Sequence, residues 1–134
     1  MKNFEMTSSM LTMTGGFYPK GYAFIMFPNA TDARHVAQEI TSQQDDEKQV
    51  LFLSSHTILQ DVGKVKGESD IALPSLGTEG VTADRYVDLA REGHCALMVK
   101  VDTDQETERV MQVARHASFS YGQRYRLFVI EDLE

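Results

Sequence analysis

Between Gly93 and Leu133 the chain reads GHCALMVKVDTDQETERVMQVARHASFSYGQRYRLFVIEDL. The apolar run from Ala96 to Val101 is rich in valine and has the length of a central β-strand that is covered on at least one face. A polar segment with helical periodicity follows from about Thr103, and a second apolar run extends from Tyr125 to Ile130. This succession of strand, helix and strand predicts a unit whose helix packs back on a sheet.

The beginning of the helix is marked by Thr103-Asp104-Gln105-Glu106, which has the form of a capping box. In such a box the threonine hydroxyl accepts a hydrogen bond from the amide three residues on, and the glutamate reaches back to the threonine amide. Acidic residues near this end and basic residues near the other end agree with the helix dipole. A spacing of i, i+3, i+4 and i+7 predicts one buried stripe, made of Val110, Val113, Ala114 and Ala117.

The last predicted strand, Arg124 to Ile130, alternates at first and then becomes wholly apolar, which indicates one buried face and one partly buried face. Arg124 and Arg126 lie beside Tyr121 and Tyr125 and form a basic and aromatic cluster. Two arginines at positions i and i+2 of a strand favour an exposed rim over a nucleic-acid site. A net charge of -7 also repels a phosphate backbone, so we expect no nucleic-acid partner.

Length and composition bound the class of protein. A chain of 134 residues is expected to form a single domain, residues 1–134, with an ordinary core. Its one cysteine, Cys95, excludes an intramolecular disulfide. We find no secretory signal and no apolar run that approaches the ~20 residues of a membrane span. We therefore expect a cytoplasmic protein that does not associate with membranes.

The N-terminal residues 1–20 show no sustained period and predict a loose or edge-paired arm. The arm contains methionines that could bind a soft metal, but their irregular spacing favours packing: Met1, Met6, Met10 and Met13. The segment Tyr22 to Phe27 predicts a strand, which Pro28 ends. A helix from about Thr31 to Ser42, capped by Asn29 or Thr31, follows with a buried stripe of Ala33, Val36, Ala37 and Ile40.

The middle of the chain contains a second strand, Val50 to Leu53, and a short helical turn from His56 to Val62. Residues 61–81 collect Gly, Ser, Pro and charged residues without period and predict a loop excursion. A further helix begins at Thr82 and is stopped by Gly93 at a C′ position.

The two halves of the chain resemble each other, because Ala23 to Gln38 and Ala96 to Gln112 share the order of strand, polar cap and helix. Two interleaved β-α-β units with both long helices on one face predict an α+β ferredoxin-like sandwich. Its loop and helix excursion lies between the second and third strands. The strand and stripe residues that point inward predict one shared core: Ile25, Val36, Ile40, Leu97, Val99, Val110 and Val113.

The segment Gly80 to Asp102, GVTADRYVDLAREGHCALMVKVD, together with the Glu- and Arg-rich helix after it, resembles the C-terminal half of the small bacterial general stress (heat-induced stress) proteins. The first strand and helix, Phe24 to Ile40, also fit that pattern, so the resemblance covers about two-thirds of the chain. The resemblance implies a stress-associated role and carries over no active-site residue. The family usually has a Gly/Ala-rich apolar middle, whereas Asp61 to Gly80 is polar here, which speaks against membrane association.

The sequence contains no Gly-rich phosphate loop, metalloprotease motif, Cys-x-x-Cys pair or nucleophile elbow. His94 and Cys95 are neighbours on a strand, where adjacent side chains point to opposite faces, so they favour a buried thiol beside a surface imidazole. His35 and His116 occupy corresponding parts of the long helices. They would form a metal or proton site if they faced each other, but their positions favour the solvent margin of the buried stripes.

Three functions remain open. The first is a non-enzymatic interaction or regulatory module that pairs with itself or with another protein. The second is a dimeric α+β-barrel that binds a small molecule, or a cofactor-free enzyme, with an apolar pocket lined by Phe24, Met26 and Met98. The third is a metal or redox sensor that uses Cys95 and a histidine. The absence of a convergent acid–base set favours the first.

We therefore expect no catalytic residue, no metal and no cofactor. The candidate ligand-binding residues are His35, Tyr86, His94 and His116. A homo-oligomer is expected because two long helices can cover only one face of the sheet. The other face would then expose large apolar groups drawn from Tyr22, Phe24, Phe27, Phe52, Tyr125, Leu127 and Phe128.

Overall fold

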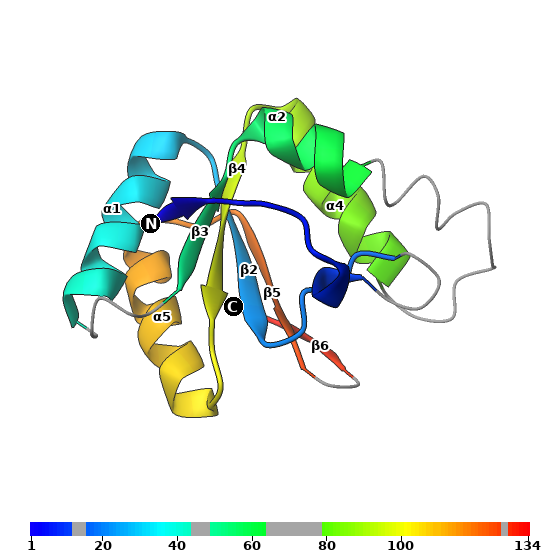
Figure 1. Cartoon of the computed structure of the whole chain (residues 1–134). Coiled ribbons are helices and arrows are strands. Elements are labelled where there is room, and N and C mark those ends of the chain that lie inside the picture. Colours follow the sequence, from blue (N-terminus) through cyan, green and yellow to red (C-terminus); the bar gives the residue numbers. More distant parts are fainter. Residues whose placement is uncertain (12–15, 44–48, 64–78, 127–128) are drawn as a thin grey trace.

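The computed structural model describes residues 1–11, 16–43, 49–63, 79–126 and 129–134. Its centre is a six-stranded mixed sheet in the order β1-β3-β4-β2-β5-β6, with helices on both faces (Figure 1). The strands are β1 (Lys2–Asn3), β2 (Tyr22–Phe27), β3 (Val50–Leu53), β4 (Cys95–Lys100), β5 (Tyr121–Tyr125) and β6 (Ile130–Asp132). The helical elements are η1 (Ser8–Met10), α1 (Ala30–Gln43), α2 (Ser55–Thr57), η2 (Ile58–Val62), α4 (Glu79–Arg91) and α5 (Asp104–His116).

Strand β2 lies inside the sheet, antiparallel to β4 on one side and to β5 on the other. β3 is antiparallel to β4, and β6 is antiparallel to β5. The units β2-α1-β3 and β4-α5-β5 are thus interleaved, as expected of two strand-helix-strand units that share one sheet. The predicted α+β class is confirmed, and the sheet is wider than predicted because β1 and β6 extend it.

Helices α1 and α5 cover one face of the sheet (Figure 1). One buried cluster lies between these helices and the sheet. It contains the apolar stripes of the two helices and the alternate residues of β2 and β4 that point towards them. The predicted core is confirmed, since all its members belong to this cluster: Ile25, Val36, Ile40, Leu97, Val99, Val110 and Val113.

The opposite face is also covered, by α4, the turn α2-η2 and the N-terminal arm (Figure 1). Phe24 of β2 stacks on Tyr86 of α4 with ring centroids 4.0 Å apart, and Phe17 of the arm packs edge-on against Phe24 at 5.7 Å. The expectation of an uncovered face was therefore wrong, because the arm and α4 supply aromatic side chains that fill it. The homo-oligomer was predicted because one sheet face was expected to be uncovered. That reason no longer holds, and the oligomeric state stays a prediction.

The N-terminal arm is paired at the sheet edge, one of the two alternatives that the sequence left open. β1 runs parallel to β3, and the Phe4 amide donates to the Phe52 carbonyl at 3.0 Å. Phe4, Met10 and Phe17 are buried, so the arm contributes to the core rather than lying loose. Met13 lies outside the described residues.

The end of the chain differs from the prediction. The expected strand from Arg124 to Ile130 is replaced by β5 and β6, which form a hairpin in which the Arg126 amide donates to the Val129 carbonyl at 2.8 Å. β5 begins at Tyr121, and at Gly122 the C-terminal segment approaches closely: a Cβ there would lie 3.3 Å from Leu133 Cβ. Leu127 and Phe128 lie outside the described residues.

The middle of the chain follows the prediction in part. The short helical turn is confirmed as α2 and the π-turn η2, and the Ser54 hydroxyl caps it by accepting from the Thr57 amide at 3.1 Å. Helix α4 begins at Glu79, earlier than the predicted Thr82. Most of the predicted excursion, residues 64–78, lies outside the described residues.

In the part of the chain that the structure describes, every helix is too short or too polar to cross a lipid bilayer.

Candidate functional site

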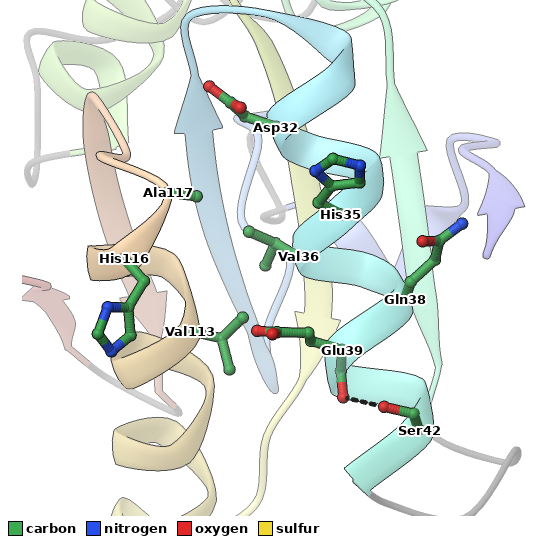
Figure 2. A pocket seen from close by; sticks show the side chains of 9 residues that line it. All are labelled: Asp32, His35, Val36, Gln38, Glu39, Ser42, Val113, His116 and Ala117. Atoms are coloured by element: carbon green, nitrogen blue, oxygen red, sulfur yellow. Dashed lines mark hydrogen bonds between the residues drawn. The ribbon is translucent and has the colours of Figure 1, made fainter.

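Helices α1 and α5 border an open groove of about 570 Å³, called the helix groove below (Figure 2). It lies on the outer surface of the helical layer that covers the sheet. Its described lining comes from one side of each helix: Asp32, His35, Val36, Gln38, Glu39 and Ser42 of α1, Val113 and His116 of α5, and Ala117, the C-cap of α5. The groove therefore brings together His35 and His116, two of the residues nominated from the sequence.

Helix α1 is capped at its start by Asn29, one of the two cap residues, Asn29 or Thr31, that the sequence left open. The Asn29 side-chain oxygen accepts from the Asp32 amide at 2.9 Å, and its Nδ2 donates to the Asp32 carboxylate at 3.1 Å. With the apolar stripe of α1 turned to the sheet, the residues between those positions are left on the outside. His35, Gln38, Glu39 and Ser42 are exposed for this reason.

Helix α5 has defined caps at both ends. The Thr103 hydroxyl accepts from the Glu106 amide at 3.0 Å, which confirms the predicted N-cap. At the other end Ser118 adopts a positive φ of 55°, and the Phe119 amide donates to the Ala114 carbonyl at 3.3 Å. This is the geometry of a left-handed C-cap, and it ends the helix just beyond His116.

The floor of the helix groove is closed by packing. Val36 is 1% exposed and Val113 is 6% exposed, and both belong to the core cluster under the helices. The rim is polar and open to solvent. In Figure 2 the Glu39 carboxylate points across the groove towards Val113, whereas the His116 ring points away from α1. The two imidazoles do not face each other, so their positions agree with the solvent-margin interpretation.

The polar groups of the rim make few contacts within the protein. In the described part of the chain, no hydrogen bond or ion pair engages the Glu39 carboxylate, and none engages the rings of His35 and His116. Asp32 has one described hydrogen-bonding side-chain partner, Asn29. Among the described residues that line it, two carry carboxylates and none is a lysine or arginine, so this part of the helix groove is acidic when its imidazoles are neutral.

Tyr86, another candidate residue, lies on the opposite side of the sheet. Its side chain is fully buried, and its hydroxyl is hydrogen-bonded to that of Tyr125 at 2.9 Å. Burial, and then the charge of a neighbouring Tyr125, hold the pKa of Tyr86 well above its usual range. The hydroxyl is therefore closed to a ligand from solvent in this structure.

His94 lies at the entry to β4, partly buried, and its Nδ1 is hydrogen-bonded to the Ser120 hydroxyl at 2.9 Å. Serine and imidazole together can form a nucleophilic dyad, but such a dyad also needs donors for a developing oxyanion. This contact joins the residue before β4 to the residue before β5, so the His94 ring is engaged within the protein. The candidate residues thus occupy three separate places, and only the histidines of the helix groove share a surface.

Cys95 is a buried thiol, as predicted. It is 3% exposed, and its sulfur approaches the Phe27 carbonyl at 3.8 Å. Burial raises the pKa of the Cys95 thiol to about 11. Since the thiolate is the reactive form, these surroundings do not favour the redox-sensor hypothesis.

The apolar pocket expected of a barrel-type binding protein is not formed by the residues proposed for it. Phe24, Met26 and Met98 are fully buried, and they pack in the same cluster as Tyr86 and Phe17. All three side chains therefore belong to the buried core on the side of the sheet that α4 covers.

The prediction of an exposed arginine rim was wrong for Arg124. It is 5% exposed, and its guanidinium donates to Asp104 at 2.6 Å and lies 3.6 Å from Glu131. Strand alternation turns Arg124 to the face that α5 covers, where Asp104 opens the helix. The acidic first turn of α5 was the available signal, but its register against β5 depends on the tertiary fold. Arg126 remains half-exposed.

A second hollow of about 290 Å³ lies between α5 and the C-terminal strand. Its charged groups pair with each other: Arg124 with Asp104, and Arg115 with Glu108 and with the Glu134 carbonyl. Among the described residues no three His, Cys, Asp or Glu side chains lie close enough to hold a metal ion.

Comparison of the chain with models of protein families, with curated proteins and with solved structures finds no match. The resemblance to the general stress proteins is neither supported nor opposed by this result.

Proposed function

We propose that the protein is a non-enzymatic interaction module that binds another protein through the helix groove. The observation that carries this proposal is a contrast between two kinds of polar residue. Two candidate residues outside the groove form hydrogen bonds within the protein: Tyr86 with Tyr125, and His94 with Ser120. The rim residues Glu39, His35 and His116 make no such contact with any described residue. They remain available to a partner.

An enzymatic role has weaker support. General acid–base catalysis needs a donor and an acceptor held within hydrogen-bond reach of one reacting atom. The titratable candidates lie at the helix groove, under α4 and at the entry to β4, and thus do not converge. Tyr86 and Cys95 are also held in their protonated forms by burial.

The fold proposed for this module is a ferredoxin-like core with additions. The inner strand order β3-β4-β2-β5, with α1 and α5 on one face, supports this proposal, and β1 and β6 would then be extensions at its edges. The stress-associated role rests only on the resemblance of residues 80–102 to the general stress proteins. A cytoplasmic location belongs to the same proposal.

A small-molecule ligand in the helix groove is the alternative. Its support is the volume of about 570 Å³, which falls within the range of about 300–1,000 Å³ usual for ligand pockets. The closed apolar floor opposes it, because such pockets bind mainly by burying apolar ligand surface.

The test is site-specific photo-cross-linking in cells. A photoreactive amino acid replaces Gln38 at the groove rim or, as a control, Gln60, which is exposed on η2 beside the opposite sheet face. We expect a cross-linked protein from position 38, none from position 60, and loss of the product when Ser42→Trp obstructs the groove. Mass spectrometry then identifies the partner. Equal products at both positions, or a product that Ser42→Trp leaves unchanged, would contradict the proposal.

A further inference from the structure

We infer that the segment recognised by the helix groove belongs to a partner protein and presents an arginine side chain to Glu39. This inference rests on the proposed function and gives the partner its chemistry. It follows from the small apolar surface of the groove, from the charge of its described lining residues and from the shape of its floor.

The helix groove offers little apolar surface. Val36 and Val113 form its floor, but both are already buried in the core of the protein. Ala117 is partly exposed and has only a methyl side chain. An aromatic or leucine anchor of the kind that dominates many interfaces would find no pocket to fill here. Recognition therefore depends on the polar rim.

The charged groups of the rim select a cation. Among the described lining residues, Asp32 and Glu39 carry carboxylates, and the other titratable groups are the imidazoles of His35 and His116. Asp32 already accepts from Asn29, whereas Glu39 is free of any ion pair with a described residue and points across the groove (Figure 2). The whole chain, with a net charge of -7, adds a long-range attraction for a basic segment.

Arg115 and Arg34, which lie near the groove, are engaged elsewhere, and Arg109, an exposed residue of α5, is not among the described residues that line it. Arg115 of α5 binds both oxygens of Glu108 at 2.8 and 3.3 Å and donates to the Glu134 carbonyl at 2.7 Å. Arg34 of α1 lies over the Phe52 ring at 5.8 Å, towards β3. Neither residue lines the groove, so neither occupies the place that a guanidinium from a partner would take.

Arginine fits this groove better than lysine for geometric reasons. A guanidinium is planar and can donate two parallel hydrogen bonds to one carboxylate, whereas an ammonium is a compact and strongly hydrated charge. The methylene groups of the arginine side chain can lie along Ala117 and the small exposed part of Val113. The shallow floor then becomes useful, because it supports a flat side chain without needing to enclose it.

The experiment is a nuclear magnetic resonance titration of the isotope-labelled full chain with short peptides whose ends are acetylated and amidated. One peptide carries arginines among alanines, and matched peptides carry lysine or glutamate instead. We expect the arginine peptide to shift the amide signals of Gln38, Glu39 and His116, to bind more tightly than the lysine peptide, and to weaken as salt is added. The glutamate peptide should not bind.

Variants make the assignment to Glu39 specific. Glu39→Gln should weaken binding of the arginine peptide by about three- to fivefold, the upper range for a single exposed ion pair. Glu92→Gln removes the same charge from the exposed turn after α4 and should change the affinity much less. Equal effects of the two substitutions, or peptide-induced shifts that lie outside the groove, would overturn the inference.

Two further outcomes separate this inference from the proposed function. If the glutamate peptide bound the groove as tightly as the arginine peptide, or if free spermidine shifted the same signals at the same concentration, the arginine partner would be wrong. The cross-linking result at Gln38 would still support an interaction module. If Gln38 gave no cross-linked protein, the proposed function itself would fail, whatever the peptides did.

Discussion

At the scale of single residues, buried polar groups are matched with partners that the sequence does not place beside them. Arg124 is paired with Asp104 across the gap between β5 and α5, and Tyr86 meets Tyr125 between α4 and β5. Gln123 is also buried, and its Nε2 donates to the Tyr121 hydroxyl at 2.8 Å and to Asp132. Each pair satisfies a group that would be costly to bury alone.

Removing the Tyr86 hydroxyl tests one of these pairs. Tyr86→Phe should lower the free energy of unfolding by about 1 kcal/mol, because one buried hydrogen bond is lost while the ring stays in place. Urea denaturation measures the change. Tyr86→Phe combined with Tyr125→Phe should cost less than the sum of the single substitutions. Strict additivity would show that the two hydroxyls do not interact.

The Asp104–Arg124 contact should make stability depend on pH. The hydrogen bond from Arg124, and then its charge, lower the pKa of Asp104 below its usual value. A carboxyl group with a lowered folded-state pKa contributes stability that is present above its unfolded pKa, about 3.9, and is lost as the pH falls through the folded value. Asp104→Asn should therefore flatten the stability profile below about pH 4.

Denaturant unfolding at a series of pH values measures this profile. Asp102→Asn is the matched control, because it removes an equal charge from an exposed position that makes no ion pair with a described residue. If both substitutions flattened the acid limb equally, the contact with Arg124 would not be the cause.

At the scale of elements, α5 carries the best-defined signals at its ends. Its Thr103 N-cap was predicted from four residues, since a capping box is local chemistry. Its C-cap was not predicted, because serine is an unusual residue for a positive φ. Ser118 adopts this conformation at a φ of 55° so that the chain can turn from α5 into β5.

Replacing Ser118 with glycine should stabilise the protein. The left-handed conformation costs an L-residue about 1–2 kcal/mol, whereas glycine loses about 0.5–1 kcal/mol through its greater freedom in the unfolded chain. Ser118→Gly should therefore raise the free energy of unfolding by about 0.5–1 kcal/mol. Thermal and urea unfolding measure the gain. Ser118→Ala, which keeps the strain, should bring none.

Strand β4 holds the sheet together because it pairs with β2 along one edge and with β3 along the other. Leu97 lies in its middle and is fully buried beneath α1 and α5. Leu97→Ala should lower the free energy of unfolding by roughly 2–5 kcal/mol, through lost burial and a cavity. A decrease in the free energy of unfolding below about half a kcal/mol would show that Leu97 contributes little to the core.

At the scale of the whole molecule, the sheet is covered on both faces and its edges are short. The outer strands β1 and β6 are 2 and 3 residues long. Short edge strands offer few free backbone groups to another copy of the chain. Because no uncovered sheet face remains as a reason for self-association, we predict a monomer in place of the homo-oligomer predicted from the sequence.

Light scattering at micromolar concentration tests this point. We expect a mass near 15.1 kDa. A mass of twice this value would mean that the chain associates through a surface other than the sheet faces. Cross-links formed by the photoreactive residue at position 38 would then show whether that surface is the helix groove.

Local pattern was enough to predict the alternation of strands and helices, the inward stripes of α1 and α5, and the cap at Thr103. For the cap of α1 it offered two candidates, Asn29 and Thr31. Each of these depends on residues that lie within one or two turns of each other, so their physics is contained in short segments. The core around Leu97 and Val110 followed from the same periodicity. The exposed positions of His35 and His116 also followed, as margins of those stripes.

Tertiary structure alone decided the features that join distant segments. The N-terminal arm and α4 cover the second sheet face because Phe17 and Tyr86 meet Phe24 across long stretches of chain. Arg124 is buried because β5 lies beside the acidic start of α5. The helix groove exists because two stripes of different helices dock side by side and leave Glu39 on the rim. The periodicity of one segment cannot predict how that segment lies against another, because the register between segments is set by the packing of the whole core.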